Sequence, residues 1–128
     1  MILVDTSVWV EALRKGESPE AKALRVLLDE DRVATASPVR VEILSGASIR
    51  SLGRLRRLLS ALPNWAPTTA TWQSLETWVA QAVAAGQTFG VGDLLIAGIG
   101  AEHQAEIWSL DGAFPRMAKL GFIQLYVP

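Results

Sequence analysis

The chain has 128 residues, half of which are hydrophobic, and its formal net charge at pH 7 is −1. This length favours one domain, residues 1–128, with a single buried core. Because the chain contains no cysteine, disulfide bonds, thiolate metal sites and cysteine nucleophiles are excluded. No apolar run has the length of a membrane span or the flanks of a signal peptide, so we expect a cytoplasmic protein.

The first part of the chain predicts two strands separated by two helices. The apolar run Ile2–Val4 has the pattern of a short buried strand, and Asp5 stands at its carboxyl end. Residues 7–16 and 18–31 have the apolar spacing of helices, and residues 32–37 form the second predicted strand. Open α/β sheets carry their chemistry at the carboxyl ends of strands, which draws attention to Asp5.

The middle of the chain is predicted to be mainly helical. One helical region covers residues 37–62, with Ser37 as its N-cap, and stops before Pro63. Residues 64–67 form a brief extended piece, and a further helix covers residues 68–86.

The last part of the chain returns to alternating elements. It predicts a helix over residues 93–103, a strand over 106–110, a turn with a short helix over 111–121 and a closing strand over 122–127. Alternation of strands and helices along the whole chain predicts an α/β fold, with a mostly parallel central sheet and helices on both faces.

Four acidic residues are candidates for a shared site: Asp5, Glu42, Asp93 and Asp111. Three of them also have a structural interpretation, because Asp is favoured at helix starts and in Asp-Gly turns. Glu42 lies among apolar neighbours in VRVEIL, where burial of a carboxylate without a partner would be costly. For each residue taken alone, the structural alternative stays open.

Taken together, the four carboxylates are expected at one edge of the sheet, because parallel strands end at the same edge. Such a cluster repels itself unless a cation neutralises it. An all-oxygen ligand set favours a hard divalent ion, so we expect Mg²⁺ or Mn²⁺. The only histidine, His103, comes ten residues after Asp93, which is about 15 Å along a helix. We interpret His103 as a surface or packing residue.

Four segments carry a family resemblance. LVDTSVW, VEILSG, GDLLIAG and WSLDGAF resemble, in this order, the acidic motifs of PIN-domain nucleases, in particular the VapC-type toxins of bacterial toxin–antitoxin modules. The resemblance runs nearly end to end and implies a PIN-like three-layer sandwich. One departure is Ser109, where such proteins more often carry Thr, although the hydroxyl is retained.

This resemblance implies a Mg²⁺- or Mn²⁺-dependent endoribonuclease. The four acids would be the catalytic residues and would hold one or two ions, and water would attack the phosphate to leave 5′-phosphate and 3′-hydroxyl ends. Thr6 and Ser7 are expected to orient a metal-bound water, with Ser109 as a further auxiliary hydroxyl. The implied partners are RNA, a cognate VapB-like antitoxin and a second copy in a homodimer, with no membrane.

Positive charge is unevenly distributed along the chain. No Lys or Arg occurs from Leu58 to Pro115, whereas Arg116 follows Asp111 by five residues. We therefore predict that Arg116 contacts RNA near the site. The segment RSLGRLRR is predicted to be an outer rail for the RNA backbone, through Arg54, Arg56 and Arg57. The alternative is that this segment is only a solvated helix face.

The chain has more apolar surface than packing against a single sheet would bury. The leucines within residues 52–62, together with Trp72 and Trp78, predict a surface that a partner covers. A short antitoxin segment is expected in a groove beside the helix that starts at Ile49, with a cationic side chain that reaches the acids.

Two other classes of function were weighed. A catalytically inactive PIN-like module that binds RNA or protein is the main alternative, although no acid is missing. An aspartyl-phosphate protein is the second. A phosphatase of the haloacid dehalogenase type needs an Asp where Ser7 stands, and a response-regulator receiver needs an acceptor Asp and a Lys for which the chain offers no candidate.

Overall fold

The computed structural model describes all 128 residues. In chain order its elements are β1 (Ile2–Val4), α1 (Thr6–Arg14), α2 (Pro19–Asp29), β2 (Val33–Ala36), α3 (Ser37–Ser45), α4 (Leu52–Ser60), β3 (Asn64–Trp65), α5 (Thr69–Ala84), α6 (Val91–Glu102), β4 (Glu106–Trp108), α7 (Ala113–Lys119) and β5 (Gln124–Leu125).

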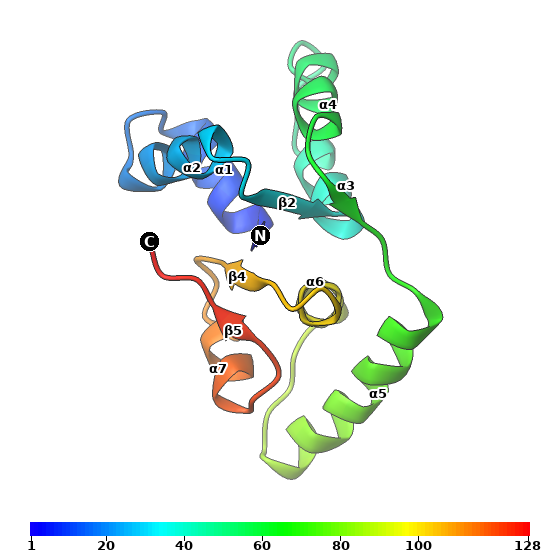
Figure 1. Ribbon diagram of the computed structural model, residues 1–128. Coiled ribbons are helices and arrows are strands. Elements are labelled where there is room, and N and C mark those ends of the chain that lie inside the picture. The colour runs from blue at the N-terminus through cyan, green and yellow to red at the C-terminus, as the bar shows by residue number, and fades with distance from the viewer.

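The five strands form one parallel sheet in the order β3-β2-β1-β4-β5. Helices α1 to α4 lie on one side of the sheet and α5 to α7 on the other, which gives three layers (Figure 1). This arrangement confirms the predicted α/β class and the predicted parallel sheet. None of the helices combines the length and the apolar character needed to cross a bilayer.

The central strand β1 fixes the position of Asp5. All three of its residues are buried, as expected for a strand covered on both faces. In the register with β4, Val4 pairs with Trp108, and the backbone N–H of Asp5 donates to the Trp108 carbonyl at 2.9 Å. Asp5 follows β1 and Ser109 follows β4. Because the last residues of the two strands are paired, Asp5 and Ser109 lie next to each other at the edge of the sheet.

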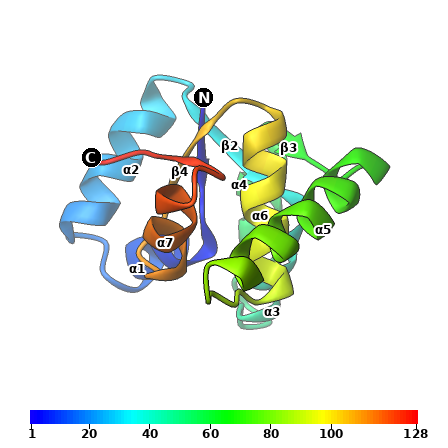
Figure 2. The ribbon, with the colours of Figure 1, turned by 90° about the horizontal axis from the view of Figure 1, so that it is seen from below.

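Helix α6 packs closely against its neighbours because it carries glycine on its buried faces. A Cβ at Gly100 would lie 2.8 Å from the Ile107 Cδ1 atom of β4, and one at Gly98 would lie 2.8 Å from Leu75 Cδ2 of α5. Figure 2 shows β1 running toward the end of the molecule where α1, α3 and α7 lie. The first turn of α6 therefore delivers Asp93 to the carboxyl edge of the sheet.

The predicted helical region 37–62 is wrong in two respects. It is two helices, α3 and α4, because the turn between them uses the hydroxyls of Ser48 and Ser51, which lie 2.9 Å apart and also bond to the local backbone. Ser37 is not the N-cap, which is Ala36 without a side-chain bond. The Ser37 hydroxyl instead accepts a hydrogen bond from the Asn64 amide at 3.2 Å.

Two further differences concern short elements. The extended piece after Pro63 contains a strand that the sequence did not predict, β3. Its two residues pair with Thr35 and Ala36 at the edge of the sheet. A two-residue strand is too short to show an alternating pattern. The leucine stripe of α4 is mainly core rather than partner surface, because Leu55 and Leu59 are buried and only Leu58 is exposed.

Candidate active site

Asp5 is held in place by one of its two carboxylate oxygens. The residue is 4% exposed and is the N-cap of α1, so the capping interpretation of the sequence is confirmed. Its Oδ2 atom accepts hydrogen bonds from the hydroxyls of Ser7 and Ser109, both at 2.7 Å, and from the Ser7 backbone N–H at 3.4 Å. The Oδ1 atom accepts none and is not sealed from solvent, so it is free to bind a ligand.

The same two serines tie the ends of β1 and β4 together. Ser7 Oγ accepts from the Leu110 backbone N–H at 2.9 Å, and Ser109 Oγ accepts from the Asp111 backbone N–H at 3.0 Å. The Oδ1 atom of Asp111 in turn accepts from the Ala113 N–H at 2.8 Å, which confirms the predicted turn. This network fixes the backbone around Asp111. The predicted role of Ser7 in orienting water stays a prediction.

Glu42 lies at the rim of the site and is exposed, so the expectation that it is buried among apolar neighbours is wrong. The face of α3 that carries it is open, and its neighbour Val41 is 63% exposed. Thr6 Oγ1 donates to Glu42 Oε1 at 3.2 Å. The pKa of Glu42 is raised, chiefly because the surrounding protein removes water from it, while the bond from Thr6 lowers the pKa and the charge of Asp5 raises it.

Asp93 is the electrostatic centre of the four acids. It lies in the first turn of α6 and makes no cap bond. Desolvation raises its pKa most, and the charges of Asp111, Asp5 and Glu42 raise it further, in that order. The four predicted acids therefore lie near enough for their charges to interact. Arg116 acts on the same carboxyl in the opposite direction and lowers its pKa.

The donor set of this cluster fits a hard divalent cation. In Asp5, Glu42 and Asp111, one carboxylate oxygen accepts hydrogen bonds from the protein and the other accepts none. Neither carboxylate oxygen of Asp93 accepts a hydrogen bond from the protein. As the side chains stand, no three of them converge closely enough to form a ready metal cage. Mutual repulsion keeps like charges apart, and an ion with oxygen ligands opposes this repulsion.

Comparison with known proteins agrees with this arrangement. The sequence pattern of the PIN domain matches residues 2–120. The chain belongs to the PIN domain family. It is 36% identical to Ribonuclease VapC11 of Mycobacterium tuberculosis. The alignment has 129 positions and covers 97% of this chain and 96% of the relative. The chain has the same identity and coverage to VapC ribonuclease Mb1587 of Mycobacterium bovis.

Solved structures of VapBC proteins have a similar fold. VapBC2 from Rickettsia felis, bound to a DNA fragment from its promoter, superposes with a TM-score of 0.80 at 21% identity and covers 98% of each chain. VapBC from Salmonella typhimurium, also bound to DNA, has a TM-score of 0.79 at 18% identity, covering 98% of this chain and 96% of the other. These matches establish the three-layer fold of this PIN domain.

The charge of Arg116 reaches the Asp93 carboxyl of this PIN domain, whereas the predicted contact of Arg116 with RNA stays a prediction. Its Nη1 atom donates to Gln87 Oε1 at 2.8 Å, and its guanidinium carbon lies 4.8 Å from the centroid of the Phe89 ring. Sequence reasoning missed Gln87 and Phe89. The available signal was their place in the loop that precedes Asp93.

The predicted rail residues and His103 form no salt bridge with the four acids. Arg54, Arg56 and Arg57 are exposed on α4 and form no salt bridge. A groove of about 370 Å³ between α1 and the α3–α4 turn is lined by Arg14, Glu42 and Arg54, among others. His103 stacks on Trp65 with ring centroids 4.0 Å apart, which confirms its interpretation as a packing residue.

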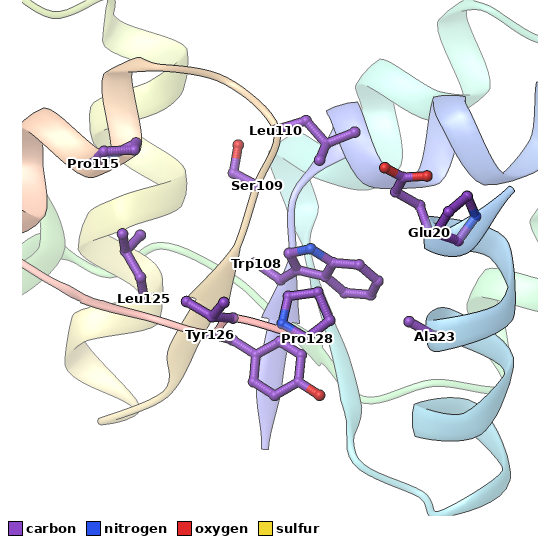
Figure 3. Close-up of a pocket in the computed structure, with 11 residues that line it drawn as sticks. Glu20, Ala23, Trp108, Ser109, Leu110, Pro115, Leu125, Tyr126 and Pro128 are labelled. Atoms are coloured by element: carbon purple, nitrogen blue, oxygen red, sulfur yellow. The ribbon is translucent and has the colours of Figure 1, made fainter.

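A separate pocket of about 430 Å³ lies behind the loop that carries Ser109 (Figure 3). Trp108, Leu110 and Tyr126 line it from one side, and Glu20 approaches from α2 (Figure 3). It contains none of the four clustered acids and is mainly apolar. Ser109, which donates to Asp5, also lines this pocket, so the pocket borders the candidate active site but does not include its acids.

Proposed function

We propose that this PIN domain is a Mg²⁺- or Mn²⁺-dependent endoribonuclease and the toxin of a toxin–antitoxin pair. The observation that carries the proposal is the acid cluster around Asp93, in which each carboxylate keeps at least one oxygen free of protein hydrogen bonds. The names of the relatives, VapC ribonucleases, supply the substrate class.

In the proposed mechanism the four acids would hold the cation with their free oxygens, and the serine network keeps Asp5 and Asp111 from turning away. When bound, Mg²⁺ or Mn²⁺ would activate water and neutralise charge on the scissile phosphate. The water oxygen forms the new bond to phosphorus while the bond to the 3′ oxygen breaks, and one proton of the water ends on the 3′ oxygen. The products carry a 5′-phosphate and a 3′-hydroxyl.

Labelled RNA tests the nuclease proposal directly. We expect the chain to cut a single-stranded RNA in Mg²⁺ or Mn²⁺, with 5′-phosphate ends that a ligation assay detects, and to be inactive in EDTA. A 2′,3′-cyclic phosphate product, or equal cleavage in EDTA, would contradict the mechanism. Absence of cleavage with retained RNA binding would instead support the alternative of an inactive binding module.

Metal binding is tested without turnover by thermal unfolding. Mn²⁺ should raise the midpoint of the wild type, because a ligand that binds only the folded state stabilises it, by about 2.7 kcal/mol at a hundredfold excess over Kd. Asp93→Asn should show a much smaller shift. Equal shifts in the two proteins would remove Asp93 from the ligand set.

The RNA path is proposed to run from Arg116 to the outer rail formed by Arg54, Arg56 and Arg57. The rail residues are exposed and unpaired, so their charges are available to phosphates. Replacing all three with Gln should weaken RNA binding and reduce its salt dependence by about 0.7 per lost contact on single strands. An unchanged salt slope would show that α4 is only a solvated face.

The antitoxin segment is proposed to lie in the groove between α1 and the α3–α4 turn. The groove starts beside α4, which begins at Leu52 rather than at Ile49 as predicted, and Glu42 borders it. A cationic side chain of the segment would reach the acids from there and inhibit by neutralising them. Co-expression with any small adjacent reading frame tests this: we expect a stable complex that blocks cleavage, and loss of the complex in Leu13→Asp, a residue of the groove that is 48% exposed.

A homodimer is proposed through the exposed face of α5 and the start of α6. Trp72, Val79 and Val91 are 47%, 45% and 66% exposed and line one apolar groove. Trp78 does not contribute in the predicted way, because it stacks on Phe122. Light scattering should give a dimer for the wild type and a monomer for Val79→Glu.

A further inference from the structure

The side chain of Arg116 is held on two sides by a loop far from it in sequence. Gln87 accepts a hydrogen bond from Nη1 at 2.8 Å, and the guanidinium group lies over the Phe89 ring at 4.8 Å. Gln87 and Phe89 are half-buried in the connection between α5 and α6, whereas Arg116 is on α7 and exposed. The two contacts thus hold a flexible, exposed cation in one direction.

These contacts join the two segments that carry Asp111 and Asp93, because Arg116 follows Asp111 by five residues and Phe89 precedes Asp93 by four. The charge of Arg116 lowers the pKa of the Asp93 carboxyl, which agrees with this placement. No other Lys or Arg occurs between Leu58 and Arg116. A guanidinium has five N–H donors, and Gln87 uses one of them. The remaining donors form the planar fork that suits a phosphate.

We propose that Gln87 and Phe89 are positioning residues that hold Arg116 ready to bind a phosphate of the RNA beside the four acids. The proposal rests on the proposed function and goes beyond it by assigning two residues of the α5–α6 loop to substrate binding. Holding a long side chain in its bound conformation reduces the entropy lost when the ligand binds. Gln87 and Phe89 therefore act only through Arg116.

A double-mutant cycle separates this role from a merely structural one. The readout is the Kd of a fluorescent, mixed-sequence single-stranded RNA, measured in the Asp93→Asn background so that no RNA is cut. We expect Arg116→Ala to weaken binding roughly tenfold and Gln87→Ala and Phe89→Leu roughly threefold each. In Arg116→Ala, the loop substitutions should have no further effect, because their only route to RNA is gone.

Matched controls share the loop and the helix. Thr88→Ala changes the exposed residue between Gln87 and Phe89, and Lys119→Ala removes a cation from the same helix as Arg116. Thr88→Ala should leave Kd unchanged and Lys119→Ala should change it much less than Arg116→Ala does. Phe89→Tyr, which keeps an aromatic face, should bind as tightly as the parent.

Three outcomes would overturn the proposal. If Gln87→Ala weakens RNA binding by the same factor with Arg116 present and in Arg116→Ala, Gln87 stabilises the fold and does not position Arg116. An unchanged Kd in Arg116→Ala would remove the phosphate contact, and so would a parent chain that does not bind RNA. The nuclease proposal fails on a different measurement, if the wild type leaves the RNA intact in Mg²⁺. The Kd values of the double-mutant cycle can still be compared in that case.

Discussion

The two halves of the acid cluster are built differently. On one side, Asp5 and Asp111 accept hydrogen bonds from hydroxyls or backbone N–H groups, and Ser7 and Ser109 connect them. On the other side, Glu42 accepts one bond from Thr6, Asp93 accepts none, and both have a raised pKa. Hydrogen bonds fix Asp5 and Asp111, whereas Glu42 and Asp93 are the residues whose pKa values are raised by burial and by the neighbouring carboxylates. A cation bound as proposed would therefore meet two ligands already in place and two that gain most from its charge.

The largest expected effect comes from the side that carries the repulsion. Asp93→Asn should lower RNA cleavage by about a thousandfold or more, since one lost ligand removes several kcal/mol of transition-state stabilisation. The rate of cleavage of a labelled RNA at saturating Mg²⁺ measures it. Glu102→Gln, at the far end of the same helix, is the matched control and should cut as the wild type does. A variant with near-normal activity would exclude Asp93 from catalysis.

On the fixed side, the expected effect is on stability as well as activity. Ser7→Ala removes a donor to Asp5 and an acceptor for Leu110, and we expect a loss of about 1–3 kcal/mol in the free energy of unfolding, because the Asp5 bond is charge-assisted. Urea denaturation measures the loss. Ser74→Ala, on α5, serves as the control. A loss no larger than that of the control would mean that the serine network does not hold Asp5.

The pH dependence of stability distinguishes the two halves without metal. The folded pKa of Asp93 lies above its ordinary value of 3.8, so the folded state keeps a proton that the unfolded state has lost. The metal-free wild type therefore loses stability as pH rises from about 3.8 through the raised pKa. Asp93→Asn lacks this loss. The stability of the variant relative to the wild type should rise across that window and then level off.

Urea curves at several pH values in EDTA provide this comparison. A constant difference between the two proteins would show that Asp93 titrates normally. A difference that falls with pH would show that Asp93 gains a favourable partner, as an ion-pair member does.

The smallest expected effect is at the rim. Thr6→Val removes the single bond to Glu42 and should change the free energy of unfolding by no more than about 0.5 kcal/mol, since both groups reach solvent. The same bond lowers the pKa of Glu42, so its loss should move the acid limb of the cleavage rate to higher pH. A destabilisation as large as that of Ser7→Ala would erase the distinction between the two halves.

The sequence was informative where backbone geometry decides the outcome. Asp5 and Asp111 could be placed because parallel strands end together. The prediction for Glu42 is wrong because apolar neighbours in sequence do not by themselves indicate burial, and Val41 beside it is 63% exposed. Gln87 and Phe89 escaped notice because a contact between a loop and a distant helix leaves no periodic pattern. The break between α3 and α4 depends on two serine hydroxyls whose local bonds compete with the helix.

The central place of β1 has a consequence for synthesis in the cell. Strand β1 is made before both of its neighbours in the sheet, β2 and β4, and Asp5 obtains its hydrogen bond from Ser109 only after β4 has paired. A growing chain therefore holds an apolar strand with one unpaired edge and an incomplete acid cluster until β4 and Asp111 have been made. Contacts between residues so far apart also slow folding. The proposed nuclease site is therefore incomplete until Asp111 has been made, and an interval is left in which an inhibitor could bind the chain before any cleavage.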